Sequence, residues 1–451
     1  MNKPGRMTGA ALGGCLLLAA AGLAAAVDFP PVLKMRERKA AVDRVTRLRL
    51  ESLLPRVMRE TGFDMWLFIS NEDAYDPVFL TMIPEDAWCP ITQILVFYDP
   101  GPGKAVERLN VSRTNMEGFH ANAWTPAPEG EDEGRSQWEA LARIVREKNP
   151  TAIGINQSGT IWAADGLSAS SKERLVRTIG PEFASRLRSA EPMSVLWLET
   201  LLDEDIALME KAAAISHATI AETFSNKVIV PGQTTAEDLV WHYRQRVADF
   251  GLEKAFRPFF RVIGRHPDVL KAYPLEDGVI RPGDVLHCDV GLKYLRYNSD
   301  HQEMAYVLRP GEKDVPPGLM AGMAEGNKLQ EIFCGEFKAG LTGDELLGRI
   351  LARARASGIA KPRVYSHSLG FFLHEPGPLI GLPWAQDTTG ARGRVKLVPG
   401  SAFTVELSVE RPVPEWGGRE FRFRMEQVVV FTGQGKMAFL DGRQTSYHVI
   451  R

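Results

Sequence analysis

Cysteine is scarce in this chain, with four residues in 451. One of them, Cys15, lies in a segment that we expect to be removed, and the remaining three form an odd count that does not indicate a disulfide framework. One bridge among the three is possible, but its pairing cannot be read from the sequence. The chain also has no large excess of either charge, because its 54 Lys and Arg residues nearly balance its 56 Asp and Glu residues. The sequence therefore shows no electrostatic footprint for binding nucleic acid.

Long apolar runs are absent after the first 26 residues. Lys3 and Arg6 precede a stretch from 10 to 26 made almost entirely of Ala, Leu, Gly and Cys, and Ala24–Ala26 offers a cleavage site before Val27. This pattern is typical of a secretory signal peptide. A membrane anchor would need a longer apolar span, and a lipoprotein reading at Cys15 would leave too short an apolar region before the cysteine. We expect a secreted or periplasmic protein, with no membrane association after signal removal.

The rest of the chain divides into two expected domains. Residues 27–195 alternate helical patterns, at 35–61, 135–147 and 168–178, with strand-like runs at 65–69, 94–98 and 152–155, which predicts an α/β N-terminal domain. A break is expected from 191 to 200. Residues 200–451 begin with helices, one of them opened by a Thr234–Glu237 capping box, and continue with strand-like runs and two helices at 316–336 and 343–357. This order predicts an α+β C-terminal domain.

Two acids, Asp289 and Asp300, interrupt a segment (283–308) that otherwise has the pattern of buried sheet. Strand alternation places Asp289 on the face that it shares with Val285 and His287, and residues 291–299 form a connection to the next strand. Placing a carboxylate on a buried strand costs several kcal/mol unless a cation or donors compensate. A pair of aspartates at this spacing is by itself a weak signal, because two solvated acids at strand ends would look the same.

Further candidates follow in the same half of the chain. His367 and His374 lie in one short segment, and Glu406 and Glu426 each interrupt an apolar run with a strand pattern, where Glu is depleted. Each is unremarkable alone: the histidines fit structural roles, and Glu426 has Arg424 as a possible partner. Four acids and a histidine in strand contexts are harder to ascribe to solvation.

The set Asp289, Asp300, His367, Glu406 and Glu426 resembles the ligand set of the dinuclear metallopeptidases that include methionine aminopeptidase, Xaa-Pro aminopeptidase and prolidase. These enzymes share the creatinase or pita-bread fold, which is what the resemblance implies for 200–451. The segments 62–68, 209–213 and 230–234 extend the similarity over nearly the whole mature chain, with a creatinase-type N-terminal domain.

The resemblance implies a role for each residue. Asp289 would hold one metal ion, Asp300 and Glu426 would bridge two, and His367 and Glu406 would complete the second site. Carboxylates with one imidazole suit Mn, Co, Fe or Zn, and a pair of divalent ions lowers the pKa of a bound water. Glu406 would then take the proton of this water and pass it to the leaving amine. His374 would contact the substrate and stabilise the tetrahedral intermediate.

Four positions depart from the family pattern. An upstream histidine is expected where Ala272 stands, and we expect the nearest histidine, His266, to act as its catalytic substitute or that function to be absent. Glu303 replaces an arginine three residues after the second aspartate. Leu407 and Ser408 follow Glu406 where Pro-Gly is common. These departures leave the ligand set complete but put rate and substrate preference in question.

The length and signal peptide favour an Xaa-Pro dipeptidase or aminopeptidase over a cytosolic methionine aminopeptidase. The expected substrate is a peptide, preferably short, with proline after its first residue, and a homodimer is implied by the resemblance. Two alternatives remain: a creatinase-like C–N hydrolase, which works without metal, and a catalytically weak or non-catalytic binding homologue. Both would be expected to have lost ligands.

Overall fold

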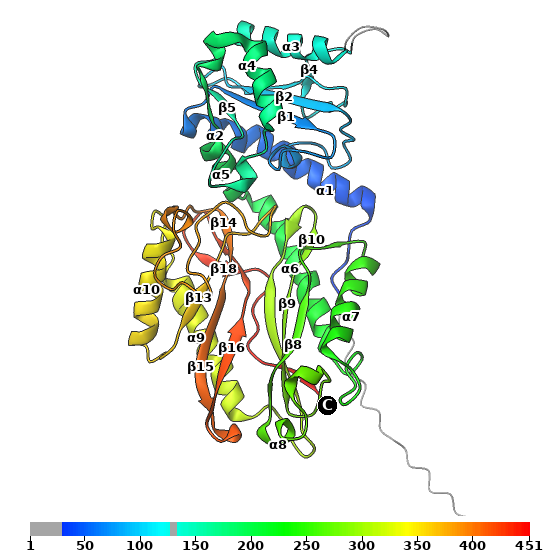
Figure 1. Cartoon of the computed structure of the whole chain (residues 1–451), viewed down its shortest axis with the longest axis vertical. Coiled ribbons are helices and arrows are strands. Elements are labelled where there is room, and N and C mark those ends of the chain that lie inside the picture. Colours follow the sequence, from blue (N-terminus) through cyan, green and yellow to red (C-terminus); the bar gives the residue numbers. More distant parts are fainter. Residues whose placement is uncertain (1–28, 127–132) are drawn as a thin grey trace, which may run out of the picture.

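The computed structural model describes residues 29–126 and 133–451, which form two regions arranged one above the other (Figure 1). The expected signal peptide, residues 1–26, lies outside the described residues. Within them, no helix combines the length and the apolar character needed to cross a bilayer. The three cysteines that are described, at 89, 288 and 334, are all free thiols.

The N-terminal region is built on one six-stranded sheet in the order β4-β3-β2-β1-β5-β6. Strands predicted near 65, 94 and 152 are confirmed as β1, β2 and β5. The central strand β1 pairs antiparallel with β2 and parallel with β5. The strands are β1 (Met65–Asn71), β2 (Thr92–Tyr98), β3 (Glu107–Asn110), β4 (Ala121–Asn122), β5 (Ile153–Ile155) and β6 (Leu187–Ser189).

Helices cover both faces of this sheet, so successive β1 residues are buried alternately against each layer. Trp66 and Phe68 pack in the core formed with the helices α1 (Met35–Leu48), α2 (Leu54–Thr61) and α5 (Glu191–Glu199), while Met65 and Leu67 pack with α3 (Glu133–Lys148) and α4 (Ala169–Ala184). The predicted helix 35–61 is confirmed, with a π-helical turn at Arg49–Leu53 between α1 and α2. Gly62, in the left-handed region at φ 75°, ends it.

The break predicted at 191–200 was wrong, because this segment is the helix α5. Pro192 lies in the first turn of this helix, where the missing N–H costs nothing and the fixed φ suits a helix. Met193, Trp197 and Leu198 are buried. The connection between the two regions is therefore a packed helix followed by a short link to α6 (Asp203–Thr223).

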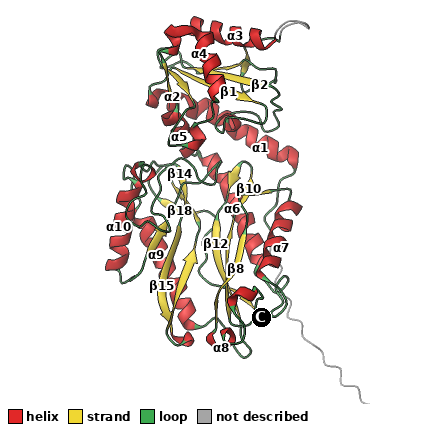
Figure 2. Cartoon of the chain, viewed as in Figure 1, coloured by secondary structure: helices red, strands yellow, loops and turns green. Residues whose placement is uncertain are grey.

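The C-terminal region places strands centrally with helices on either side (Figure 2). One sheet has the order β19-β12-β9-β8, and others are β13-β15-β16 and β14-β17-β18. The helices are α6, α7 (Ala236–Asp249), α8 (Pro267–Leu270), α9 (Pro317–Glu336) and α10 (Gly343–Ala356), and the last two confirm the predictions at 316–336 and 343–357. The strands are β7 (Glu253–Lys254), β8 (Phe259–Arg265), β9 (Asp284–Val290), β10 (Leu292–Tyr294), β11 (Tyr297–Asn298), β12 (His301–Val307), β13 (Arg363–Tyr365), β14 (Ser401–Thr404), β15 (Glu406–Val413), β16 (Arg419–Met425), β17 (Val428–Phe431), β18 (Met437–Phe439) and β19 (His448–Ile450).

The capping box predicted for α7 was displaced by one residue. Thr235 is the N-cap, its side chain accepts from the Asp238 N–H, and the Asp238 carboxylate accepts from the Thr235 N–H at 2.8 Å. Thr234 does not cap, because its hydroxyl accepts from the Val230 N–H at 2.9 Å in the preceding turn. Both threonines fit the capping pattern, and only the local turn selects between them.

Helix α9 lies against β15 and β16 at van der Waals distance because small residues face the strands. A Cβ added to Gly322 would lie 2.1 Å from the ring of Phe423, and one added to Gly326 would lie 2.3 Å from Met425. This close approach holds β16, and therefore the segment leading to Glu426, against a rigid support.

A buried ion pair joins the two regions. Arg49 donates to Asp205 at 2.6 Å and to the carbonyl of Thr200 at 2.9 Å, and the hydroxyl of Tyr297 donates to the same carboxylate. Tyr297 belongs to β11, in the connection between the strands that carry Asp289 and Asp300. The ion pair thus ties the N-terminal region to the base of that connection.

Candidate metal centre

The strands β9 and β12 form the antiparallel pair expected around the two aspartates. Asp289 lies opposite Gln302, and His301 lies opposite Val290, so Asp300 immediately precedes the paired segment. Asp289 and Asp300 therefore reach the same end of the sheet from neighbouring strands. Asp300 is buried, and Asp289 is only partly exposed.

The other three predicted ligands come from a second sheet. His367 follows β13, Glu406 begins β15, and Glu426 follows β16, with Tyr365 paired to Glu406 and Leu407 paired to Met425. An isolated antiparallel bridge between Gln302 and Glu426 joins this sheet to β12. The register across the two sheets thereby brings residues more than 130 positions apart to one place.

The donor atoms of Asp300, His367 and Glu426 lie within 4.8 Å of one another, and no other group of three potential ligands in the described parts of the chain meets this distance. His367 Nε2 is 3.7 Å from an oxygen of Asp300. The ring of His374 lies 4.3 Å from that of His367, so His374 borders the cluster on its histidine side. Three of the five predicted ligands therefore share one site, and His374 borders it. Asp289 and Glu406 lie near enough for their charges to act on Asp300.

The four carboxylates repel one another at close range. Burial, followed by the negative charges of Asp289 and Glu406, raises the pKa of Asp300 well above its usual value. The pKa of Glu426 is also raised well above normal, by burial and then by Asp300, Glu406 and Asp289. Burial raises the pKa of Asp289 to about 6 and that of Glu406 to about 7.

Burial lowers the pKa values of the two imidazoles, because it disfavours the charged form of a histidine just as it disfavours that of an acid. Burial, with a smaller contribution from His374, lowers the pKa of His367 to about 3. Burial also lowers the pKa of His374, and the positive charge of Arg392 adds to this. Both rings are therefore neutral near pH 7, which is the form in which a histidine offers a nitrogen lone pair to a metal ion.

A divalent cation fits this arrangement. Asp300 Oδ1 and Glu426 Oε1 are buried oxygens that have no hydrogen-bond partner among the described residues, an arrangement that costs free energy unless a cation compensates. Several buried acids beside a neutral imidazole form an oxygen and nitrogen donor set suited to a divalent transition metal. A cation would offset both the burial of the carboxylates and the repulsion that adds to the pKa increase of Asp300 and Glu426.

His266 does not reach the cluster. The prediction that it takes the place of the missing catalytic histidine was therefore wrong, because it lies too far away. On β8, Phe259 pairs with Asp289 and Arg265 pairs with Asp284, which puts His266 at the far end of the strands. At about 3.3 Å per residue, the span from Asp284 to Asp289 is about 17 Å. The His266 side chain instead caps the one-turn helix α8, and its Nε2 lies 2.5 Å from a nitrogen of Arg309.

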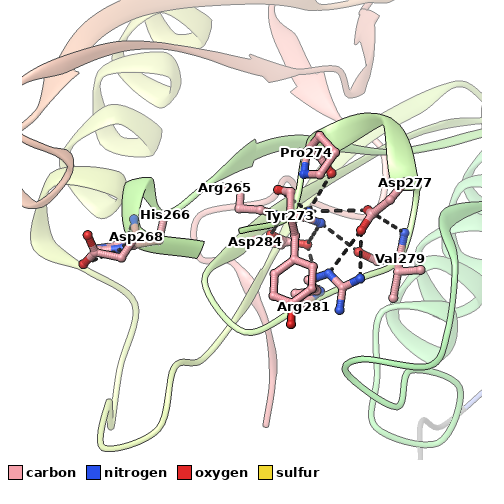
Figure 3. A network of polar contacts seen from close by, with 9 residues as sticks. All are labelled: Arg265, His266, Asp268, Tyr273, Pro274, Asp277, Val279, Arg281 and Asp284. Atoms are coloured by element: carbon pink, nitrogen blue, oxygen red, sulfur yellow. Dashed lines mark hydrogen bonds and ion pairs between the residues drawn. The ribbon is translucent and has the colours of Figure 1, made fainter. Parts of the chain in front are cut away.

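The loop that follows is fixed by Arg265 rather than by His266 (Figure 3). The buried Arg265 guanidinium pairs with both oxygens of Asp284 at 2.6 and 2.8 Å and donates to the carbonyls of Tyr273, Pro274 and Val279. His266 points away from this network toward Asp268. A re-registered loop that brings His266 to the position of Ala272 is therefore not what the chain adopts.

Sequence reasoning missed several residues at the cluster. The Gln302 amide donates to Glu426 at 2.7 Å, and its oxygen lies 2.9 Å from Nε2 of His287. Arg392 donates to the carbonyls of Glu375 and Gly377, which anchors the turn after His374. Strand alternation placed His287 on the face of Asp289, a signal that could have indicated its contact with the cluster. Nothing in the sequence distinguished Gln302 or Arg392.

A cavity of about 170 Å³ opens beside Glu406 and Gln302. Its other lining residues include Tyr365 and three arginines, Arg363, Arg422 and Arg424. Arg422 is paired with Glu410 at 2.7 Å, and the charge of Arg424 acts on Glu406 and lowers its pKa against the larger effect of burial. The wall beside the carboxylates is therefore cationic.

Comparison with known proteins matches this site to a family. Residues 207–433, half of the chain, match the metallopeptidase family M24. The chain belongs to this family. It is a metallopeptidase, and the resemblance noted from its five ligand positions is confirmed at the level of the family and of the pita-bread fold. No curated protein sequence matches the chain significantly.

Solved structures show that this fold extends over nearly the whole described chain. An X-Pro aminopeptidase from Thermotoga maritima has 18% sequence identity and a TM-score of 0.61, over 87% of this chain and 99% of that one. A dipeptidase from Pyrococcus horikoshii has 17% identity and a TM-score of 0.56, over 89% and 100%. An Xaa-Pro dipeptidase from Bacillus anthracis has 19% identity and a TM-score of 0.54, over 91% and 100%. At these identities the comparison shows the shared fold.

Proposed function

We propose that this M24 metallopeptidase hydrolyses the peptide bond before proline, as an Xaa-Pro dipeptidase or aminopeptidase that uses two divalent metal ions. The observation that carries the proposal is the convergence of Asp300, His367 and Glu426, with buried oxygens left free for a cation. The preference for proline is supported by the names of two of the structures that share the fold. The retained ligand set argues against a creatinase-like or non-catalytic homologue.

In this proposal each ligand keeps the role that the family pattern assigns to it. Asp289 would hold one ion, Asp300 and Glu426 would contribute to both sites, and His367 and Glu406 would complete the second site. Mn, Co, Fe or Zn suits these donors, and such ions would supply a water of lowered pKa when bound. The charges of neighbouring carboxylates add to burial in raising the pKa of Asp300 and Glu426, which supports a site that holds more than one positive charge.

Glu406 would accept the proton of the attacking water in its ionised form and pass it to the leaving amine. Burial raises its pKa, and general acid–base groups work best when their pKa is near the working pH. Glu406 also lines the cavity, so it faces the space where the leaving amine would lie. His374 is neutral and borders the cluster, where it can donate to the oxygen that gains negative charge.

The cationic wall of the cavity supports a short substrate. A free C-terminal carboxylate beside the scissile bond would be attracted to Arg424, whereas a long peptide would place uncharged backbone there. The N-terminal region lies at one end of the catalytic region (Figure 1). We therefore favour dipeptides among the Xaa-Pro substrates.

Metal removal and reloading tests the proposal. The mature chain is stripped with chelator and reloaded with Mn²⁺, Co²⁺ or Zn²⁺, and bound metal is measured beside hydrolysis of Xaa-Pro dipeptides, longer Xaa-Pro peptides and matched Xaa-Ala dipeptides. We expect about two ions per chain and cleavage that requires metal and proline. Asp300→Ala should abolish both. A chain that binds no metal after reloading, or an Asp300→Ala variant with full turnover, would contradict the assignment.

We also propose export and a homodimer. The basic and apolar composition of residues 1–26 supports export, and the notion of a dimer rests on the family resemblance alone. Mass spectrometry of the N-terminus after expression in a host with a secretion pathway should show Val27 as the first residue. Light scattering should give a mass near twice that of one chain, and a monomer would refute the dimer.

A further inference from the structure

The side chain of Gln302 lies at the centre of the candidate metal centre without being one of the predicted ligands. It is almost fully buried, and it contacts three residues from three other strands or strand ends. Its Nε2 is 2.7 Å from Glu426 Oε2, and its Oε1 is 2.9 Å from His287 Nε2. A hydrogen bond from the same side chain favours the ionised form of Glu406. One carboxamide thus links a histidine of β9 to two glutamates of the second sheet.

The chemistry of its partners fixes which way the amide faces. Ionised Glu426 and Glu406 only accept hydrogen bonds, so they require the NH₂ side of Gln302. The oxygen of Gln302 then faces His287, which must donate through Nε2–H. His287 is buried, and its Nε2 lies 2.9 Å from the Gln302 oxygen, a position from which the ring can donate one hydrogen bond. The chain of donors therefore runs from His287 to Gln302 and on to the glutamates.

The main chain holds this side chain in place. Gln302 and Glu426 exchange two backbone hydrogen bonds, at 3.0 and 3.1 Å, and Gln302 is paired with Asp289 on its other side. With Glu426 Oε2 occupied by the amide, Oε1 of the same carboxylate is left buried and without a partner. The carboxylate cannot rotate toward a different donor without losing the Gln302 contact.

We propose that Gln302 is a positioning residue of the metal centre, which orients Glu426 and Glu406 for cation binding and is itself oriented by His287. This rests on the proposed function of the site. A neutral carboxamide is suited to the task, since it donates two hydrogen bonds to acidic ligands without adding a positive charge that would compete with the cation. Partners that hold metal ligands commonly contribute about 10- to 100-fold in metal affinity.

The experiment measures Mn²⁺ affinity of the full mature chain by competition with a fluorescent chelator. Gln302→Met keeps the length of the side chain and removes both donors, and we expect it to bind Mn²⁺ about 10- to 100-fold more weakly than the parent. His287→Leu should weaken binding in the same direction. His287→Gln, which restores a donor toward Gln302, should recover parental affinity, a rescue that a purely space-filling role of His287 would not produce.

Circular dichroism and thermal melting of the metal-free chains establish which variants are folded, and His266→Ala, outside the cluster, is the matched histidine control. A folded Gln302→Met with parental Mn²⁺ affinity overturns the role of Gln302. If Gln302→Met does not fold, the His287 pair decides, and a His287→Gln variant as weak as His287→Leu overturns the proposal. A parent chain that binds no Mn²⁺ refutes the proposed function, whereas a parent that binds beside an unaffected Gln302→Met refutes only this inference.

Discussion

Neutralising two carboxylates of the cluster should stabilise the metal-free protein, by an amount that grows with pH. Burial raises the pKa of Asp289 from 3.8 to about 6 and that of Glu406 from 4.5 to about 7. Because the folded state favours the protonated forms, these groups contribute stability that is fully present below about pH 4 and is lost as the pH rises through about 6 to 7. The double variant Asp289→Asn/Glu406→Gln keeps the shapes and removes this titration.

The size of the effect follows from the two pKa changes. One pKa unit corresponds to about 1.4 kcal/mol, which gives about 3 kcal/mol for each group at pH 8. Both side chains are partly exposed, and screening by solvent reduces this to about 2 kcal/mol each. We expect the free energy of unfolding of the double variant to exceed that of the parent by about 4 kcal/mol at pH 8 and by about 1 to 2 kcal/mol at pH 5.

Urea unfolding of chelator-stripped chains, followed by circular dichroism at both pH values, measures this difference. The difference between variant and parent is the useful quantity, because buried His287 and His367 have lowered pKa values of about 4 and about 3. Such histidines make any version of the chain more stable as the pH rises, and they cancel in the comparison. A difference that is the same at pH 5 and pH 8, or a parent more stable than the variant at pH 8, would refute the electrostatic account.

Addition of Mn²⁺ should make the parent more stable to unfolding than the double variant. A ligand that binds only the folded state stabilises it by about 2.7 kcal/mol at 100 times its dissociation constant. The parent should gain this stability, and the double variant, which lacks two predicted ligands, should gain far less. Equal stabilisation of both proteins would show that Mn²⁺ binds elsewhere.

Three further predictions concern positions outside the ligand set. Gly322→Ala should lower the free energy of unfolding, measured in urea, by about 1 to 3 kcal/mol, since its Cβ would overlap the Phe423 ring. Gly348→Ala in α10 is the control and should not destabilise the chain, because its Cβ would meet nothing within 4 Å. Equal effects of the two substitutions would refute the close-packing argument. Arg265→Met should cost about 3 to 5 kcal/mol in the same assay, because it leaves buried Asp284 without its partner; a cost below 1 kcal/mol would contradict this. His266→Ala should leave kcat/KM for an Xaa-Pro dipeptide unchanged, and a large loss would place His266 in the reaction after all.

The sequence was most informative where periodicity and spacing act locally. The long helix from 35 to 61, the strand β1 and the pair of strands around Asp289 and Asp300 all follow from local patterns of apolar residues. The same patterns did not resolve competing choices one residue apart, as at the cap of α7. They also failed at α5, where proline in a first turn looks the same in the sequence as proline in a loop.

In the candidate site too, local patterns identified some residues and could not identify others. Four of the five ligand positions stood out because acids are unexpected in strands. Their meeting depends on the bridge between Gln302 and Glu426, which no local pattern encodes. Gln302 carries no charge and fits any half-buried strand, so nothing marked it. His266 was chosen because it is near Ala272 in sequence, yet the direction of β8 carries it to the opposite end of the sheet from Asp289.

The strand β12, which follows Asp300, pairs with β19, the last strand of the chain to be synthesised. The strand that follows Asp300 receives its parallel neighbour only from residues 448–450, and buried Glu303 on it finds the imidazole of His448 there. Ribosomes add residues in order, so every predicted ligand has been made before this edge of the sheet is covered. A growing chain that stops short of His448 would carry the complete set of acids on a sheet with an open edge, and Glu303 would lack its His448 partner.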